Sequence, residues 1–235
     1  MRRCVIAVID LRAATVFISD GSVSAVAATT LSADAARGST VLALTSATGY
    51  IPGLGITIGD SLEYYVIEAV AGTSVTIVPP LVEDAASTDP VEAIGNMLEV
   101  KIGEGTLTYS EKRAVTYVLN RGKIYTVKLG DDSPVEVSLD FIWEFLRAAT
   151  GDPPTVEEAL KNIGEASDWV SSSSDPCEPY AVNITICYVP PCGDSERIEL
   201  ADFRWESLDH DLKAGQVSVK GNCNIAFATV THGTS

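Results

Sequence analysis

The stretch that most constrains the fold is Pro134 to Phe145, PVEVSLDFIWEF, in which apolar residues recur at every second position. The apolar positions are Val135, Val137, Leu139, Phe141, Trp143 and Phe145. Three of the residues between them are carboxylates, namely Glu136, Asp140 and Glu144. Successive side chains of a strand point to opposite faces, so this period of two predicts a strand with an apolar aromatic face and an acidic face. The strand is expected to form part of a wall with a core on one side.

Composition restricts the class of protein. A chain of 235 residues is long enough for one large domain or two modest ones. The net charge of −16, from 32 acids and 16 bases, argues against a nucleic-acid-binding surface but is compatible with DNA that merely passes the protein. The sequence contains no run of about 18 apolar residues, so no membrane-spanning helix is predicted. The opening run MRRCVIAVID ends at Asp10, too early for a signal peptide, and is predicted to be a first strand.

Residues 28–94 differ in composition from the rest of the chain. They are rich in Ala, Thr, Gly and Val, and they contain eight acids and a single base, Arg37. Short β-prone runs (STVLALT, GITIG, EYYVIEAV and SVTIVP) are separated by glycine and proline turn signals. The pattern predicts a small all-β domain, inserted into a larger domain formed by residues 1–27 and 95–235.

The larger domain reads as a series of longer strands. Residues 1–27 are expected to form a strand pair, and strands from 105 to 145 are expected to turn at Arg121-Gly122 and again at residues 130–132. Charge is segregated along this part: residues 95–130 carry six bases and three acids, whereas residues 131–178 carry two bases and twelve acids. Residues 171–179 are predicted to be a loop.

One helix is predicted near the middle of the larger domain. Thr155 suits the N-cap, Glu158 completes a capping box, and Gly164 suits the C-terminal stop. A second helix, over residues 138–149, is the alternative to the alternating strand, because Leu139, Ile142, Trp143 and Leu146 also fall at helical spacing.

The sequence offers little catalytic chemistry. His210 lies between Asp209 and Asp211, which predicts a solvated polar turn, with an oriented acid/base or weak metal site as the alternative. His232 is expected to lie in a mobile C-terminal tail. No phosphate-binding loop, zinc-protease or serine-hydrolase motif is present, so neither an enzyme nor a cofactor is expected.

The cysteines also match no known site pattern. Cys4, Cys177, Cys187, Cys192 and Cys223 contain no CxxC pair, and their odd number is typical of reduced protein. A zinc site formed by the last four is the alternative to partly buried free thiols.

Three stretches resemble the major tail tube proteins of tailed bacteriophages. They are residues 105–145, with the turn GDDSP before the aromatic strand, residues 166–192, and residues 196–224, with FRWESLDHDLKAGQVSVKGNCN. Their order along the chain is also similar: a long strand, the turn, the aromatic strand, a helix and the last motif. Most tube proteins lack a domain in the position of residues 28–94.

The resemblance implies a mainly β subunit with a β-sandwich or barrel-like fold and one α-helix, and with the small all-β domain on its outside. Such subunits would form hexameric rings that stack into the tail tube of the virion after synthesis in the host cytoplasm. Partners would be other copies, the tape measure, terminator and baseplate proteins, and DNA that passes without specific binding. Neither a membrane nor a metal is implied.

A tube lined with carboxylates repels phosphate, so Glu136, Asp140 and Glu144 are the candidate lumen-facing residues. The alternative is that they face solvent outside the ring. The loop 171–179 and the segment from Gly103 to Glu111 are the expected contacts between subunits or rings. Alternative functions are a tail terminator, a baseplate-hub or head-proximal ring protein, a surface-binding module that uses residues 28–94 to recognise carbohydrate or protein, and, as a weaker option, a hydrolase that uses Asp209, His210 and Asp211.

Overall fold

The structure is a computed structural model that describes residues 14–103, 105–142, 153–190 and 195–233. The protein is mainly β, as the sequence predicts. The strands are β1 (Ala14–Ser19), β2 (Thr29–Thr30), β3 (Val41–Ala43), β4 (Leu54–Ile58), β5 (Tyr65–Ala71), β6 (Ser74–Val78), β7 (Pro90–Glu99), β8 (Leu107–Ser110), β9 (Arg113–Asn120), β10 (Lys123–Asp132), β11 (Val135–Ile142), β12 (Val182–Tyr188), β13 (Glu196–Asp211), β14 (Gln216–Cys223) and β15 (Thr229–His232). Within the described ranges the helices are α1 (Val156–Lys161) and the 3-10 turn η2 (Gly164–Ala166).

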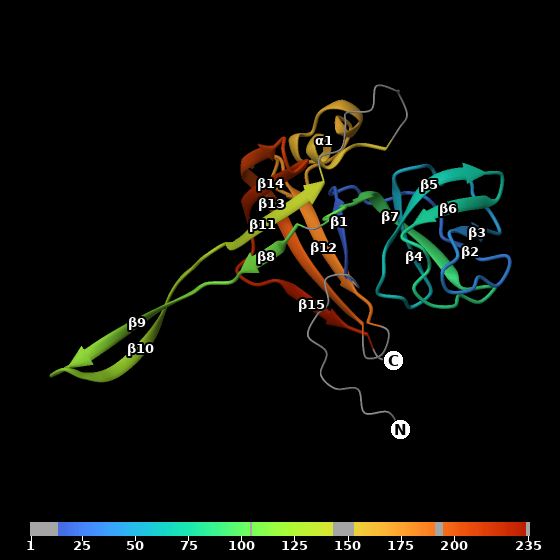
Figure 1. Ribbon diagram of the computed structural model, residues 1–235. Coiled ribbons are helices and arrows are strands. Elements are labelled where there is room, and N and C mark those ends of the chain that lie inside the picture. The colour runs from blue at the N-terminus through green and yellow to red at the C-terminus, as the bar shows by residue number, and fades with distance from the viewer. Residues whose placement is uncertain (1–13, 104, 143–152, 191–194, 234–235) are drawn as a thin grey trace.

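One antiparallel sheet runs through most of the molecule in the order β3-β6-β5-β4-β7-β1-β12-β13-β14-β11-β8. Its first part, β2 to β6, forms a small β domain at one end of the molecule, and its second part forms the main domain (Figure 1). β7 joins the two, because it pairs with β4 from Val91 to Asn96 and with β1 from Met97 to Glu99. This strand therefore runs through the predicted domain boundary at residues 94 and 95 without a break.

The small β domain has a hydrophobic core of its own, which includes Leu42, Ile56, Tyr65, Ile77 and Val91. The four β-prone runs of the sequence correspond to β3, β4, β5 and β6. Glycine-rich residues 49–55 form turns that lead into β4 rather than into a helix.

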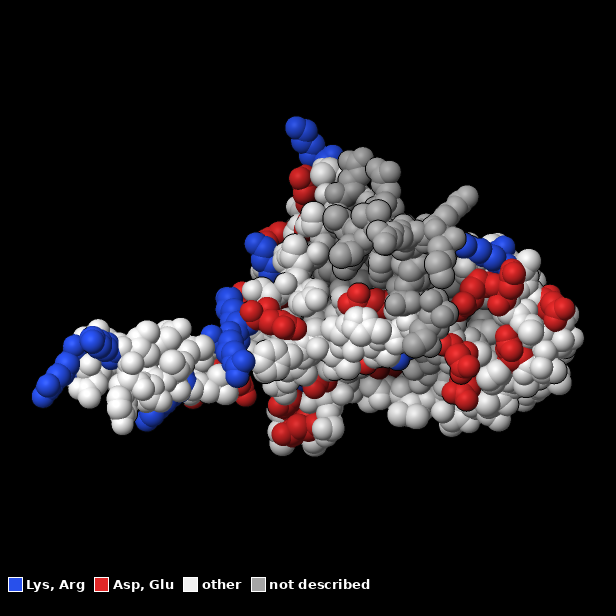
Figure 2. Space-filling model, turned by 90° about the horizontal axis from the view of Figure 1, so that it is seen from below, with Lys and Arg blue, Asp and Glu red and all other residues white. Residues whose placement is uncertain are grey.

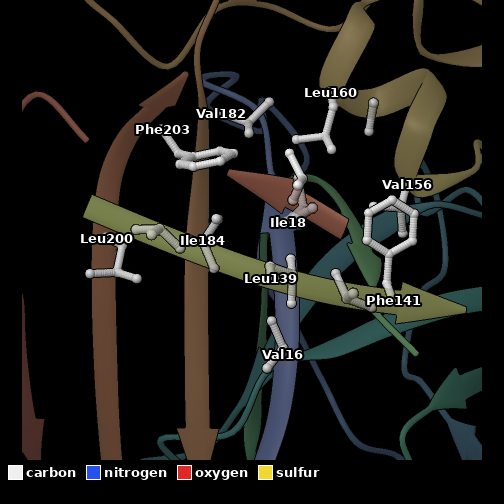
Figure 3. Packing of buried hydrophobic residues seen from close by; sticks show 14 of the residues in the cluster. Val16, Ile18, Leu139, Phe141, Val156, Leu160, Val182, Ile184, Leu200 and Phe203 are labelled. Atoms are coloured by element: carbon white, nitrogen blue, oxygen red, sulfur yellow. The ribbon is translucent and has the colours of Figure 1, made fainter. Parts of the chain in front are cut away.

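The core of the main domain forms where the sheet folds back on itself. β11 crosses over β1 and β12, so Leu139 and Phe141 pack near Val16, Ile18 and Ile184 (Figure 3). Along β11 the residues Val135, Val137, Leu139 and Phe141 are buried, whereas Glu136 is exposed. The predicted alternation is confirmed from Val135 to Ile142, and the alternative helix is wrong over residues 138–142. The remaining residues of the pattern, including Glu144, lie outside the described residues.

The helix α1 closes one end of this core. Its capping box is present: Thr155 Oγ1 accepts a hydrogen bond from the Glu158 backbone N–H at 3.3 Å, and Glu158 Oε2 accepts one from the Thr155 backbone N–H at 2.9 Å. The predicted stop at Gly164 is wrong, because the helix ends at Asn162, whose left-handed backbone (φ 53°) donates its N–H to Glu158 O. Asparagine is the residue after glycine that most readily adopts this conformation.

Both histidines lie in strands and not in the turn and the tail that the sequence predicts for them. Asp209, His210 and Asp211 extend β13, pairing with residues 216–218 of β14, so the predicted turn at these positions is wrong. His232 lies in β15, opposite Glu196 of β13, and not in a free tail. In both places a neighbouring strand supplies the hydrogen-bond partners, and sequence alone does not reveal that partner.

Two turn predictions for residues 105–132 have different outcomes. The turn at Arg121-Gly122 is confirmed, with positive φ angles of 50° and 79°. The turn at residues 130–132 is wrong, because β10 continues to Asp132, which pairs with Arg113. The single long strand expected before Arg121 is interrupted at Glu111 and Lys112, between β8 and β9.

The two domains meet at a buried contact. Phe17, Met97 and Cys187 of the main sheet pack against Val66 and Tyr64 of the small β domain. The rings of Phe17 and Tyr64 meet edge to face with centroids 6.2 Å apart, and the Arg197 guanidinium lies 4.9 Å from the Tyr64 ring centroid. Among the helices of the described ranges, none combines the length and apolar character that crossing a membrane requires.

Candidate functional site

A two-stranded arm projects from the main domain. It comprises β9, β10 and the turn between them (residues 113–132), and these two strands pair only with each other. The arm extends away from the body on the side opposite the small β domain (Figure 1). None of its residues is buried. Both outer edges of the arm therefore present unpaired backbone groups.

One face of the arm is apolar. Cross-strand partners lie on the same face, and Val115 pairs with Leu129, Tyr117 with Val127, and Leu119 with Ile124. These six residues form the apolar arm face. Ile124 is 64% exposed, Leu129 61% and Leu119 60%. The opposite face is more polar and includes Thr116, Thr126 and Lys128.

The charge of the arm is opposite to that of the body. At its base Arg113 pairs with Asp132, beside Asp131; beyond them the arm has three bases, Arg121, Lys123 and Lys128, and no acid. The rest of the chain has 12 bases and 30 acids. Figure 2 shows basic side chains at the free end of the arm and acidic ones gathered on the small β domain.

The local sequence explains why this segment forms a hairpin. β-branched and aromatic residues alternate on both sides of a two-residue turn, and positive φ at both turn residues is the geometry that suits the twist of paired strands. The sequence therefore predicts the strands and the turn. It does not reveal that nothing within the described chain covers the apolar arm face.

The candidate lumen residues Glu136 and Asp140 lie on a second surface, the polar face of the main sheet. This face is formed by β11, β14 and β13, because Glu136 pairs with Asn222, and Asp140 with Ser218, which in turn pairs with Asp209. The members of the polar face are Glu136, Ser138, Asp140, Ser218, Lys220, Asn222, Arg204, Glu206, Ser207 and Asp209. This face therefore carries four carboxylates and two bases, Lys220 and Arg204, and the Arg204 guanidinium is paired with Glu178.

The two carboxylates of β11 have different partners. Asp140 accepts hydrogen bonds from Ser218 Oγ at 2.5 Å and from Thr106 Oγ1 at 2.9 Å. The bond from Ser218 is the largest cause that lowers the pKa of Asp140, so this side chain stays ionised. Glu136 is exposed and forms an ion pair with Lys112 at the base of the arm. The third candidate, Glu144, lies outside the described residues.

A groove lies between the small β domain and the main domain. It has a volume of about 800 Å³ and is lined by the segment 58–62, Tyr65, the segment 81–85, Val189 and Pro190 after β12, and His232 and Gly233 at the end of β15. Half-buried apolar side chains, Leu62, Val82, Val189 and Pro190, line part of it. Its acidic residues are Asp60, Glu83, Asp84 and Asp89, and its bases are Arg37 and His232. Sequence reasoning missed this groove because its walls come from distant parts of the chain.

The residues considered for catalysis do not converge. The His210 ring lies 3.2 Å from Glu157 of α1. Burial alone would raise the pKa of Glu157, but its hydrogen bonds with Lys161 and His210 lower it below the ordinary value. Asp209 and Asp211 lie on the opposite face of β13 from His210, because successive side chains of a strand point to opposite faces.

The described cysteines are buried or isolated. Burial raises the pKa values of Cys187 and Cys223 to about 12, so both are neutral thiols at neutral pH. Cys177 is exposed, whereas Cys4 and Cys192 lie outside the described residues. Within the described ranges, no three His, Cys, Asp or Glu side chains gather as a metal site would require.

Comparisons of the chain with models of protein families, with curated proteins and with solved structures each found no match.

Proposed function

We propose that this protein is a structural subunit that self-assembles into rings, and that the rings stack into the tail tube of a bacteriophage virion. The observation that carries the proposal is the arm, whose apolar face and two open edges have no partner within the described chain. The resemblance of residues 105–145, 166–192 and 196–224 to tail tube proteins supports the type of assembly and its hexameric symmetry.

The arm is poorly suited to solvent. An isolated two-stranded hairpin is at best marginally stable in water, and contiguous exposed apolar residues are typical of interaction surfaces. Eight of the 19 large apolar side chains that are exposed in the described chain lie on the arm. Covering them on assembly would stabilise the arm and the complex together.

The distribution of charge favours a second copy as the partner. The charged residues in the outer part of the arm are all bases, whereas acids greatly outnumber bases in the rest of the chain. Two copies therefore attract each other through arm and body, although two whole chains of net charge −16 repel.

The polar face suits the lining of a channel. Its carboxylates would repel DNA phosphates, and Lys220 is flanked by Ser138 and Ser207 on the neighbouring strands. The channel-lining role proposed for Glu136 and Asp140 rests on this face being the uncovered side of β11, whose other side packs in the core.

Removal of the arm tests the proposal. Deletion of residues 113–132 leaves Glu111, Lys112, Ser133 and Pro134 to connect β8 and β11, which already pair from Leu107 to Ser110. No residue of either core is lost. We expect full-length protein to form rings or tubes in electron microscopy at high concentration, and the deletion variant to remain a folded monomer in sedimentation velocity.

The outcomes separate the alternatives. Tubes support the tail tube assignment, whereas single rings that never stack favour a terminator or baseplate-hub protein. A full-length protein that remains monomeric at every concentration, like the deletion variant, contradicts self-assembly. Circular dichroism of both proteins controls for loss of folding.

A further inference from the structure

The groove between the two domains has the composition that complements the free end of the arm. Leu62, Val82, Val189 and Pro190 offer partly exposed apolar surface, and four carboxylates surround it. The free end of the arm offers the reverse: Arg121 lies in the turn and Lys123 follows it. Close by are Leu119, Ile124 and Tyr125, which are among the most exposed apolar residues of the arm. The volume of about 800 Å³ accommodates several side chains.

The positions of the two surfaces determine the geometry of docking. The arm leaves the body on one side, and the small β domain, which forms one wall of the groove, lies at the other side (Figure 1). An arm of this chain therefore points away from its own groove. Contact between two different surfaces of identical copies is head-to-tail, and head-to-tail contact produces a ring when the rotation closes and a filament when it does not.

We propose that the free end of the arm of one copy docks into the groove of the next copy, with Arg121 and Lys123 near Asp60 and Glu83. This inference rests on the proposed self-assembly and adds to it the acceptor surface. It also gives the small β domain a role as part of the acceptor for a neighbouring subunit.

Charge reversal on each side tests the docking. The groove variant carries Asp60→Lys and Glu83→Lys, both at exposed positions outside the core of the small β domain. The arm variant carries Arg121→Asp and Lys123→Glu, with aspartate chosen because it tolerates the left-handed backbone at φ 50°. The control carries Glu68→Lys and Glu92→Lys, exposed acids of the same domain that do not line the groove.

Sedimentation velocity of each protein gives the expected pattern. The groove variant and the arm variant should each associate at least about tenfold more weakly than the unmodified protein, because like charges then face each other, while the control associates normally. Mixing the two variants should restore assembly, since each arm then meets a groove of opposite charge.

The possible failures are distinguishable. If arm deletion abolishes association but the groove variant behaves like the control, the groove is not the acceptor and the self-assembly proposal survives. If the mixture of variants fails to associate while each is folded by circular dichroism, direct pairing of these charges is wrong. If the unmodified protein never associates, the proposed function itself fails.

Discussion

At the scale of single residues, Glu63 is the most unusual titratable group. It is only 1% exposed, beside the contact between the two domains, and its Oε1 has no hydrogen-bond partner among the described residues. Burial is the main cause that raises its pKa to about 8; a hydrogen bond with Thr15 opposes this and the nearby Glu99 carboxylate adds to it. Cys187 and Tyr65 also lie near this carboxyl group, and burial raises the pKa of each to about 12, so both are neutral. Glu63 is therefore expected to be protonated at neutral pH.

This raised pKa predicts how stability changes with pH. The unfolded chain releases the Glu63 proton near pH 4.5 and the native protein only near pH 8. The contribution of Glu63 is thus fully present below pH 4.5 and is lost as the pH rises to 8, and a gap of this size corresponds to roughly 5 kcal/mol at most. In Glu63→Gln this pH dependence should vanish. The unfolding free energy of the variant should therefore increase relative to that of the parent from pH 5 to 8, because only the parent loses stability over this range.

Urea unfolding at several pH values measures this difference. A difference that stays constant over that range would show that Glu63 ionises normally in the native protein. Glu68→Gln, at an exposed position of the same strand region, is the matched control and should leave the pH dependence unchanged.

At the scale of elements, the stability of the short helix α1 depends on its capping box and on its packing against the core. With only six residues it cannot be stable alone, and its apolar residues Val156, Ala159 and Leu160 are held in the main core. The reciprocal hydrogen bonds of Thr155 and Glu158 satisfy backbone N–H groups that the helix leaves unpaired.

Removal of the capping hydroxyl is expected to destabilise the protein. Thr155→Ala should lower the unfolding free energy by about 1 kcal/mol, as is typical for loss of an N-cap side chain. Thr155→Ser keeps the hydroxyl and should cost less. Chemical denaturation of both variants checks the prediction, and equal losses would attribute the effect to the missing methyl group instead of the hydrogen bond.

At the scale of the whole molecule, the polar face has a consequence for DNA in the assembled particle. Glu136→Lys with Glu206→Lys would leave Lys220 beside two further cations on this face. If the face lines the channel, each added cation can displace counterions from a phosphate, so passing DNA should be retained at low salt and released at high salt.

The measurement is retention of labelled DNA by assembled particles across a salt series. Glu68→Lys with Glu92→Lys makes the same change in net charge on the small β domain and should retain less DNA. Equal retention by both variants would place the polar face outside the channel, and loss of assembly in the first variant would place it at a subunit interface.

The sequence alone determined the features that depend on near neighbours in the chain. Alternation from Val135 to Ile142 predicted a two-faced strand, Arg121-Gly122 predicted a tight turn, and Thr155 with Glu158 predicted the start of a helix. These predictions succeeded because backbone geometry and adjacent side chains decide them. The helix end at Asn162 was missed, because a suitable glycine two residues later offered a competing stop.

Only the tertiary structure decided what each face and edge meets. It placed His210 and His232 in strands, left the apolar arm face uncovered, and brought Leu62, Val82 and Val189 to one acidic groove. These outcomes depend on strands far apart in sequence finding hydrogen-bond and packing partners. A periodic pattern fixes which residues share a face, but whether a core, solvent or another subunit covers that face is decided by long-range packing.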